Sequence, residues 1–172
     1  KAGPVSAEVN GRIVKVLMPV PSGLRTDMEI PLKSKTINAD FINTGVPHVV
    51  VHANDLEGYP VFEDGREIRY HSLFSPAGTN ANFISVRDSH YIYVRTYERG
   101  VEDETLACGT GSIASALTAN ARGMASSPVT IKTRGGEELN IYFEKNGDSF
   151  TRVWLEGGTS IACTGRLNEE AY

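Results

Sequence analysis

One stretch, residues 91–117, constrains what this chain can fold into more than any other part of the sequence. A strand-like run from Tyr91 to Tyr97 leads into an acidic loop, and Cys108 then stands directly before Gly-Thr-Gly and a run of small residues. This order predicts a strand, a loop and a helix that begins at Gly109, with the thiol at the mouth of the helix. The first N–H groups of a helix have no partner inside it, so the position suits an anion or a thiolate.

The predicted helix runs from Gly109 to Arg122, is rich in alanine and serine, and has Gly123 at its C-terminal stop. Because its side chains are small, other elements can approach it closely from every side. We therefore expect a central helix that is wrapped by sheet.

Most of the remaining sequence predicts strands. Asn10-Gly11 lies between alternating runs in Val5–Leu17, which is a strong hairpin signal. The segment 19–23, with two prolines and a glycine, indicates a loop. Further strands are expected at residues 34–42, 49–51, 83–86, 129–133, 139–143 and 151–155, with a last short strand at 160–167.

A second helix is expected on the surface. Residues 61–71 have helical periodicity, with Phe62 and Ile68 facing inward and Asp64 facing outward. Many strands, one surface helix and one buried helix together predict an α+β domain.

Composition excludes some classes of function. The 172 residues carry a net charge of −4 without a basic cluster, so nothing indicates a nucleic-acid partner. The longest apolar stretches, such as Pro47–Val51, are far too short to span a membrane. Lys1-Ala-Gly-Pro does not lead into a secretory signal, and two cysteines are thin support for a disulfide framework, so we expect a cytoplasmic protein with reduced thiols.

Polar residues that lie close to the apolar runs are candidates for a site. His48 directly follows a Gly-Val-Pro turn and precedes a buried run, where a histidine is usually a core residue unless the fold brings it near the thiol. His48 and His52 would share one face of a strand, but no third ligand is in view and no metal site is expected. Asn80 and Asn82 are two residues apart and would also share a face, for which turn chemistry and a ligand role both remain open.

Three segments together resemble the diaminopimelate epimerase family. They are residues 43–48 (Asn-Thr-Gly-Val-Pro-His), 78–83 (Gly-Thr-Asn-Ala-Asn-Phe) and 97–111, in which Glu-Arg is followed by Glu-Thr-Leu-Ala-Cys-Gly-Thr-Gly. The resemblance covers nearly the whole chain and implies a mixed, strongly curved sheet around one central helix. It also implies an isomerase of lysine and peptidoglycan biosynthesis that uses no cofactor and tends to form homodimers.

The family has two similar lobes, each with one cysteine at the start of a central helix, and the active site lies between them. This chain resembles the second lobe with its connecting hairpin (residues 1–159) and a final strand (160–172) that would complete the first lobe. Nothing in it matches the cysteine segment of the first lobe. We therefore expect a fragment whose missing partner is the N-terminal lobe of the same protein.

The resemblance implies that Cys108 is one of two acid–base thiols, with Glu98 and His48 as polar partners that tune the pair. Inverting an α-carbon requires a base on one face and an acid on the other, and a thiolate is a reasonable base because its pKa can fall near a helix N-terminus. One chain with one such cysteine supplies half of this arrangement, so we expect no epimerase activity from it alone.

Other residues would hold the substrate, an amino diacid. The resemblance implies that Asn80 and Arg99 hold its distal, non-reacting end, and a guanidinium suits bidentate capture of a carboxylate. It also implies that the backbone N–H groups of Gly109 and Thr110 receive the carboxylate at the reacting carbon, where charge develops.

Val46 stands where many relatives have an asparagine that contacts substrate, so such a contact is not expected from the Val46 side chain, and Asn43 is a substitute that the sequence does not favour. Cys163 has no glycine turn or helix after it, so it is not expected to be the second thiol and reads instead as a small buried hydrophobe.

Three other functions stay open. The same fold could serve as a racemase of proline, hydroxyproline or histidine, which a substrate panel would distinguish. Cys108 and His48 could form a Cys-His hydrolase, which would give an acyl adduct on the thiol. The lobe could also be a binding module that shows affinity without turnover.

Overall fold

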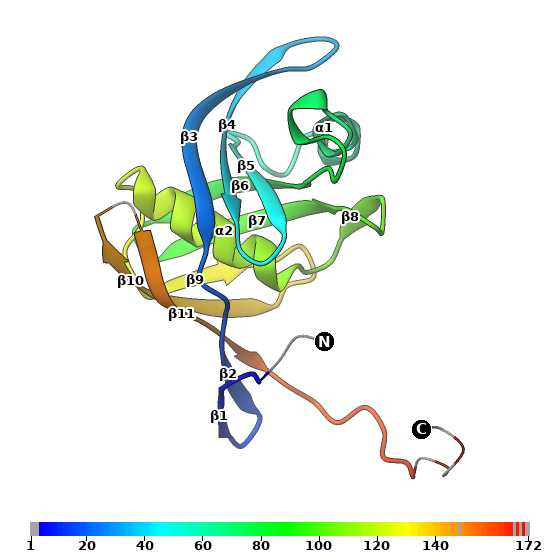
Figure 1. Cartoon of the computed structure of the whole chain (residues 1–172), viewed down its shortest axis with the longest axis vertical. Coiled ribbons are helices and arrows are strands. Elements are labelled where there is room, and N and C mark those ends of the chain that lie inside the picture. The colour runs from blue at the N-terminus through cyan, green and yellow to red at the C-terminus, as the bar shows by residue number, and fades with distance from the viewer. Residues whose placement is uncertain (1–3, 148, 167, 169, 171–172) are drawn as a thin grey trace.

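A computed structural model describes residues 4–147, 149–166, 168 and 170 (Figure 1). Within this part of the chain, eleven strands form one sheet, and the two α-helices pack against opposite faces of it. The helices are α1 (Val61–Arg69), α2 (Gly109–Ala121) and the short 3-10 helix η1 (Ser72–Phe74). The strands are β1 (Ala7–Asn10), β2 (Ile13–Leu17), β3 (Ser22–Pro31), β4 (Thr36–Asn43), β5 (Pro47–His52), β6 (Asn80–Asp88), β7 (Tyr91–Glu98), β8 (Asp103–Thr105), β9 (Val129–Lys132), β10 (Glu138–Asn146) and β11 (Ser149–Gly158).

The sheet is mixed and curls around α2. Its strand order is β1-β2-β11-β10-β9-β7-β6-β5-β4-β3, with β8 paired to β7. The β5–β6 and β7–β9 pairs are parallel and the other pairs are antiparallel. Figure 1 shows α2 lying in the hollow of this curved sheet. The predicted fold class, a curved mixed sheet wrapped around one central helix, is confirmed.

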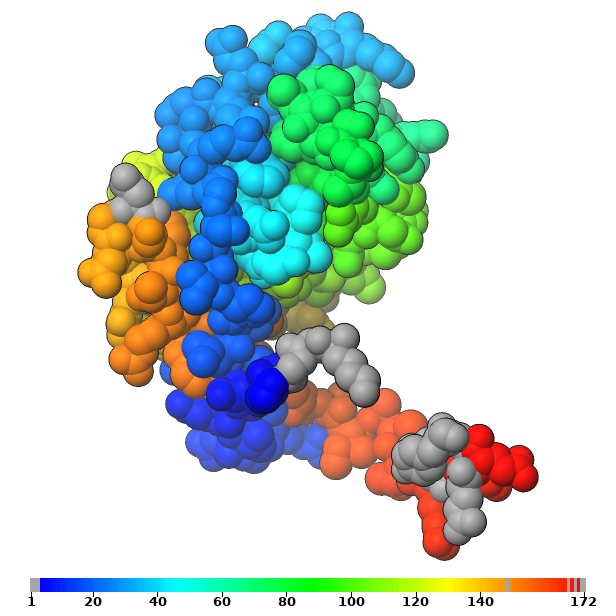
Figure 2. Space-filling view, in the orientation of Figure 1, coloured from blue at the N-terminus to red at the C-terminus, as the bar shows by residue number. Residues whose placement is uncertain are grey.

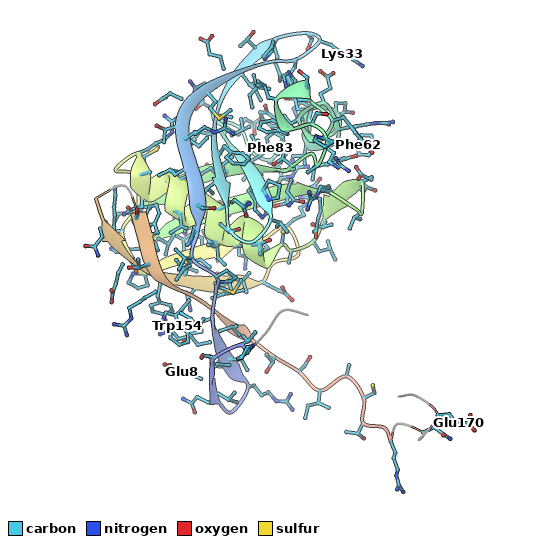
Figure 3. All side chains as sticks on the ribbon, viewed as in Figure 1. Glu8, Lys33, Phe62, Phe83, Trp154 and Glu170 are labelled. Atoms are coloured by element: carbon cyan, nitrogen blue, oxygen red, sulfur yellow. The ribbon has the colours of Figure 1, made fainter. Side chains whose placement is uncertain are left out.

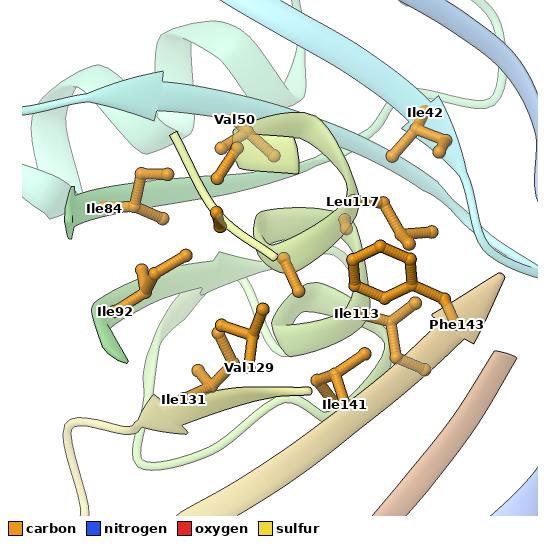
Figure 4. Packing of buried hydrophobic residues seen from close by; sticks show 14 of the residues in the cluster. Ile42, Val50, Ile84, Ile92, Ile113, Leu117, Val129, Ile131, Ile141 and Phe143 are labelled. Atoms are coloured by element: carbon orange, nitrogen blue, oxygen red, sulfur yellow. The ribbon is translucent and has the colours of Figure 1, made fainter. Parts of the chain in front are cut away.

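Helix α2 is the centre of the larger core. Every residue from Gly111 to Ala119 is buried, as the small-residue pattern predicted. Its buried hydroxyls are satisfied within the helix, since Ser112 Oγ donates to Cys108 O (2.9 Å) and Ser115 Oγ donates to Gly111 O (2.8 Å). Apolar side chains from the surrounding strands close over the helix (Figure 4), among them Ile42, Val50, Ile84, Ile92, Ile131 and Ile141.

The second core lies on the other face of the sheet, beneath α1. Successive residues of a strand point to opposite faces, so in β6 Ile84 belongs to the α2 core (Figure 4) and Phe83, which is labelled in Figure 3, belongs to the α1 core. The prediction for α1 was partly wrong. Phe62 is 43% exposed, whereas Asp64 is buried and its carboxylate lies 2.7 Å from Lys35 Nζ. The ion pair lets a charged side chain take the inward position.

The hairpin at the start of the chain is confirmed, but two expectations about strands were wrong. The sequence indicated a loop where β3 begins. Among the described strands β3 pairs only with β4, so it is an edge strand, and its residues are mostly polar and exposed. The strand expected at residues 160–167 is absent from 160–166, and residue 167 lies outside the described residues.

The reason for the second error is that no strand in the described part of the chain pairs with residues 160–166. β11 pairs with β2 as far as Gly158 opposite Ile13, where the β1–β2 turn begins. Residues 160–166 project from the body of the molecule (Figure 2). Cys163 is exposed there, so its interpretation as a buried hydrophobe was wrong. Both cysteines are free, as expected. The division into a lobe of residues 1–159 and a completing strand stays a prediction.

Candidate active site

The fold brings the predicted site residues to one end of the sheet, beside the N-terminus of α2. His48 on β5 is in register with Asn80 on the parallel strand β6. Strand β7 runs antiparallel to β6, with Tyr97 opposite Ala81, so Glu98 at the end of β7 comes next to the start of β6. His48 and Glu98 lie on the face of the sheet that carries the α2 core, because strand residues alternate between faces.

Cys108 is the N-cap residue of α2. Its backbone is extended (φ −139°, ψ 107°) and its side chain makes no capping hydrogen bond. Only 8% of the residue is exposed, and its Sγ lies 3.6 Å from the hydroxyl of Thr110. The thiol therefore stands at the helix mouth, where the sequence placed it.

The pKa of Cys108 moves in the direction opposite to the one expected. Burial raises the pKa of this thiol, and the negative charge of Glu98 raises it further. The Thr110 hydroxyl and the N–H groups of Gly111 and Thr110 act the other way, as a helix mouth should, but they do not outweigh burial. In this structure Cys108 is therefore a thiol at neutral pH.

Glu98 is positioned by the short strand β8. Thr105 Oγ1 donates to Glu98 Oε2 at 3.0 Å, and β8 pairs with the end of β7 so that Glu98 lies opposite Asp103. This role of Thr105 could not be predicted, because so short an acidic segment does not reveal the β7–β8 pairing.

Asn80 and Arg99 are connected directly. The backbone N–H of Arg99 donates to Asn80 Oδ1 (2.8 Å), and Asn80 Nδ2 donates to Pro47 O (3.2 Å). The guanidinium of Arg99 donates to Ala77 O at 3.1 Å, and in the described part of the chain it forms no ion pair with a carboxylate. Its remaining N–H groups can bind a carboxylate from outside the chain.

His48 is fully buried. Its Nδ1 lies 3.1 Å from Asn82 Nδ2, and its Nε2 has no hydrogen-bond partner among the described residues. Burial lowers the pKa of His48 to about 3, and the positive charge of Arg99 contributes in the same direction. The imidazole is therefore neutral over the whole physiological range.

The first turn of α2 is fixed by two contacts that the sequence did not reveal. Thr44 Oγ1 donates to Thr110 O at 3.1 Å, which ties the β4–β5 turn to the helix. Gly111 lies against the buried amide of Asn82, and a Cβ at Gly111 would collide with Asn82 Oδ1. Only the spacing of Asn82 from Asn80 pointed to a role for it.

Two other expectations concern binding groups. The N–H groups of Gly109 and Thr110 lie in the first turn of α2, where a helix leaves its donors without internal partners, but their role toward a carboxylate stays a prediction. Asn43 Oδ1 accepts a bond from the Gly45 N–H (2.9 Å), so this side chain shapes the turn that contains Val46.

Prominent surface hollows lie away from the thiol. One of about 260 Å³ is lined by residues that include Tyr93, Arg95 and Lys132, and one of about 460 Å³ by residues that include Lys33 and Arg66. Neither is lined by Cys108.

Comparison with known proteins identifies the family. The family model described as diaminopimelate epimerase matches residues 41–161. The chain belongs to the diaminopimelate epimerase family. The diaminopimelate epimerase of Aquifex aeolicus is 44% identical over 98% of this chain and 60% of its own length, and that of Hydrogenobaculum sp. is 40% identical over 99% and 61%. The chain thus spans about 60% of the length of these relatives.

Solved structures share the fold at low sequence identity. A hydroxyproline epimerase from Agrobacterium vitis matches with a TM-score of 0.71 and 17% identity, over 90% of this chain and 52% of its own. A probable proline racemase from Agrobacterium radiobacter matches with a TM-score of 0.67 and 15% identity, over 90% and 54%. The resemblance that the diaminopimelate epimerase motifs indicated is thereby confirmed for family and fold. Among the described residues, no helix has the length and apolar character needed to cross a membrane.

Proposed function

We propose that this chain supplies one half of the active site of a diaminopimelate epimerase, which converts LL-2,6-diaminopimelate to the meso form in lysine and peptidoglycan biosynthesis. One observation carries the proposal. Cys108 stands as a buried thiol at the mouth of the central helix, close enough to Glu98 for that carboxylate to act on its pKa.

The proposed chemistry needs no cofactor. A thiolate on the opposite lobe removes the α-proton and becomes a thiol, and the electron pair left on the α-carbon delocalises onto the carboxylate. The Cys108 thiol then gives its proton to the other face of the carbon and becomes a thiolate. The configuration is inverted, and the two sulfurs have exchanged protonation states.

Burial of Cys108 suits this role. A thiol whose pKa is raised by its surroundings keeps its proton until a carbanion forms beside it. The N–H groups of Gly109 and Thr110 would stabilise the carboxylate most strongly when it carries the developing charge. Arg99 and Asn80 would hold the distal carboxylate and amine, away from the reacting carbon.

The half-site also accounts for the predicted inactivity. A proton returned to the opposite face requires a second acid–base group across the carbon, and the other cysteine, Cys163, is exposed on the segment that projects beyond β11. We propose that the missing N-terminal lobe provides that group and closes the site over Cys108.

The hydrolase alternative is disfavoured by the same geometry. The sulfur of Cys108 contacts Thr110, and no hydrogen bond joins it to His48 among the described residues. A histidine whose pKa is about 3 is also a poor base for activating a thiol near neutral pH.

The proposal is tested with a protein in which the first lobe precedes this chain. It should epimerise LL-diaminopimelate, and Cys108→Ala should abolish turnover without preventing folding. A panel with proline, hydroxyproline and histidine should show no comparable activity. Faster turnover of one of these three amino acids would assign a different substrate to the site.

A further inference from the structure

The amide of Asn82 is the most completely engaged polar side chain near the thiol. It is fully buried on β6, between β5 and β7. Asn82 Nδ2 donates to Val49 O at 2.8 Å and lies 3.1 Å from His48 Nδ1, while Thr96 Oγ1 lies 3.0 Å from Asn82 Oδ1. All three contacts join residues that are far apart in sequence.

These contacts fix which way the amide points. The carbonyl oxygen of Val49 can only accept a hydrogen bond, so the amide nitrogen and not the amide oxygen must face it. The second hydrogen of Nδ2 is then directed at His48 Nδ1, and Oδ1 accepts from the hydroxyl of Thr96.

The orientation of the amide determines the protonation of His48. A nitrogen that accepts a hydrogen bond cannot carry a proton itself, so Nδ1 is unprotonated. A neutral imidazole has one proton, which must then be on Nε2. That nitrogen is buried and has no protein partner among the described residues.

We propose that Asn82 is a positioning residue that holds His48 as a neutral imidazole with its proton on Nε2, so that His48 offers the site a hydrogen-bond donor instead of a base. The consequence for catalysis rests on the proposed function. The protonation state itself does not, because it follows from contacts within this chain.

Two features of the environment of His48, its burial and a nearby positive charge, support this protonation state. Complete burial disfavours an imidazolium, and the nearby guanidinium of Arg99 adds a positive charge that does the same. Asn82 also touches the first turn of α2 through Gly111, so one amide sets both the imidazole and the wall beside Cys108.

The test is a nitrogen NMR spectrum of the ¹⁵N-labelled 172-residue chain, in which protonated and unprotonated imidazole nitrogens are readily told apart. Two other histidines, half-buried His71 and exposed His90, serve as internal references. His71 Nδ1 accepts from the Leu73 N–H (3.2 Å) and its Nε2 lies 3.0 Å from Pro31 O, which requires the proton on Nε2 when the ring is neutral. His90 Nδ1 lies 2.9 Å from Pro128 O, which requires the opposite tautomer.

His48, assigned by loss of its signals in His48→Gln, should show the tautomer of His71 and remain neutral over about pH 5–8, where an ordinary histidine changes charge. A protonated Nδ1, or an imidazolium signal in that range, would overturn the proposal. This result needs no variant of Asn82 and no enzymatic activity.

The causal role of the amide is tested by Asn82→Asp. A carboxylate at this position can only accept, so His48 should acquire a proton on Nδ1. Thr96→Val is the matched control, because it removes the bond to Oδ1 while both bonds from Nδ2 can persist, and it should leave the tautomer unchanged. An unprotonated Nδ1 in folded Asn82→Asp would show that the amide does not set it.

In the two-lobed protein, Asn82→Asp should lower kcat about tenfold to a hundredfold, the range seen for groups that orient an imidazole at metal sites, and should add an ionisation to the pH profile. An unchanged kcat and pH profile would refute the positioning role. A wild-type protein without epimerase activity would refute the proposed function and leave the tautomer result standing.

Discussion

Replacing Arg122 by methionine should destabilise the chain more than any change at a surface ion pair. Arg122 follows the last turn of α2 and binds the fully buried carboxylate of Asp40 on β4, with Nε–Oδ2 and Nη2–Oδ1 distances of 2.7 and 2.8 Å. The same guanidinium donates to Asn38 Oδ1 (2.9 Å) and lies 3.0 Å from Asp27 Oδ1. The Arg122–Asp40 pair anchors the end of α2 that is remote from Cys108.

The expected cost follows from leaving Asp40 buried without its main partner. Removing one member of a buried ion pair costs about 3–5 kcal/mol. The lower end, about 3 kcal/mol, applies here because the Arg122 side chain is 23% exposed and Asp40 keeps a bond from the Asp27 N–H (3.1 Å). For a chain of this size such a loss corresponds to a fall in Tm of about 6–12 °C.

Urea unfolding followed by circular dichroism measures this loss, and Arg152→Met is the matched control. Arg152 pairs with Glu144 at 3.3 Å, but its side chain is 71% exposed, so its removal should cost at most about 1 kcal/mol. A loss in Arg122→Met no larger than the loss in Arg152→Met would refute the reasoning.

The same ion pair makes stability depend on pH. Burial alone would raise the pKa of Asp40, but His52 and Arg122 beside it hold the pKa below its usual value. A depressed pKa stabilises the fold above the unfolded value, about 3.9, and this stabilisation is lost as the pH falls through the folded value. Arg122→Met should weaken this dependence, because it removes one cause of the depressed pKa.

Two further predictions concern the helix mouth and its thiol. Gly111→Ala should destabilise the chain by about 1–3 kcal/mol, because the new Cβ would collide with the Asn82 amide. Gly158→Ala is the control, since there is open space around Gly158, and it should leave the free energy of unfolding in urea nearly unchanged. Equal losses in the two variants would show that Gly111 is not closely packed against Asn82. In iodoacetamide labelling read by mass spectrometry, exposed Cys163 should react first at neutral pH, and Cys108 should become reactive only as the pH rises, since burial raises its pKa. Faster labelling of Cys108 at neutral pH would show that it is a thiolate.

The sequence predicted those elements whose structure is determined by residues close together in the chain. The Asn10-Gly11 turn carries its own hairpin signal, and the small residues of α2 report that the helix is surrounded. Strand β3 could not be recognised, because a solvated edge strand loses the apolar alternation by which strands are identified. The strand expected at 160–167 is absent from 160–166 because the pairing of β11 stops where β2 reaches its turn, and the position of that turn depends on a distant segment.

In the candidate site, too, the local motif could be predicted from the sequence, whereas its three-dimensional surroundings could not. The position of Cys108 at the helix mouth could be predicted from the residues around it. The direction of its pKa could not, because the sequence contains the helix N-terminus but not the burial that outweighs it. Likewise the bonds from Asn82 to His48 and from Thr44 to Thr110 exist only because separate strands and a helix meet at one end of the sheet.

The proposed function requires Cys108 to be one of two thiols that exchange the α-proton of diaminopimelate. Incorporation of solvent deuterium at the α-carbon tests it most directly. We expect no incorporation with this chain alone, incorporation when the first lobe precedes the chain, and loss of that incorporation in Cys108→Ala. Incorporation by the chain alone, or by the two-lobed protein without Cys108, would contradict it.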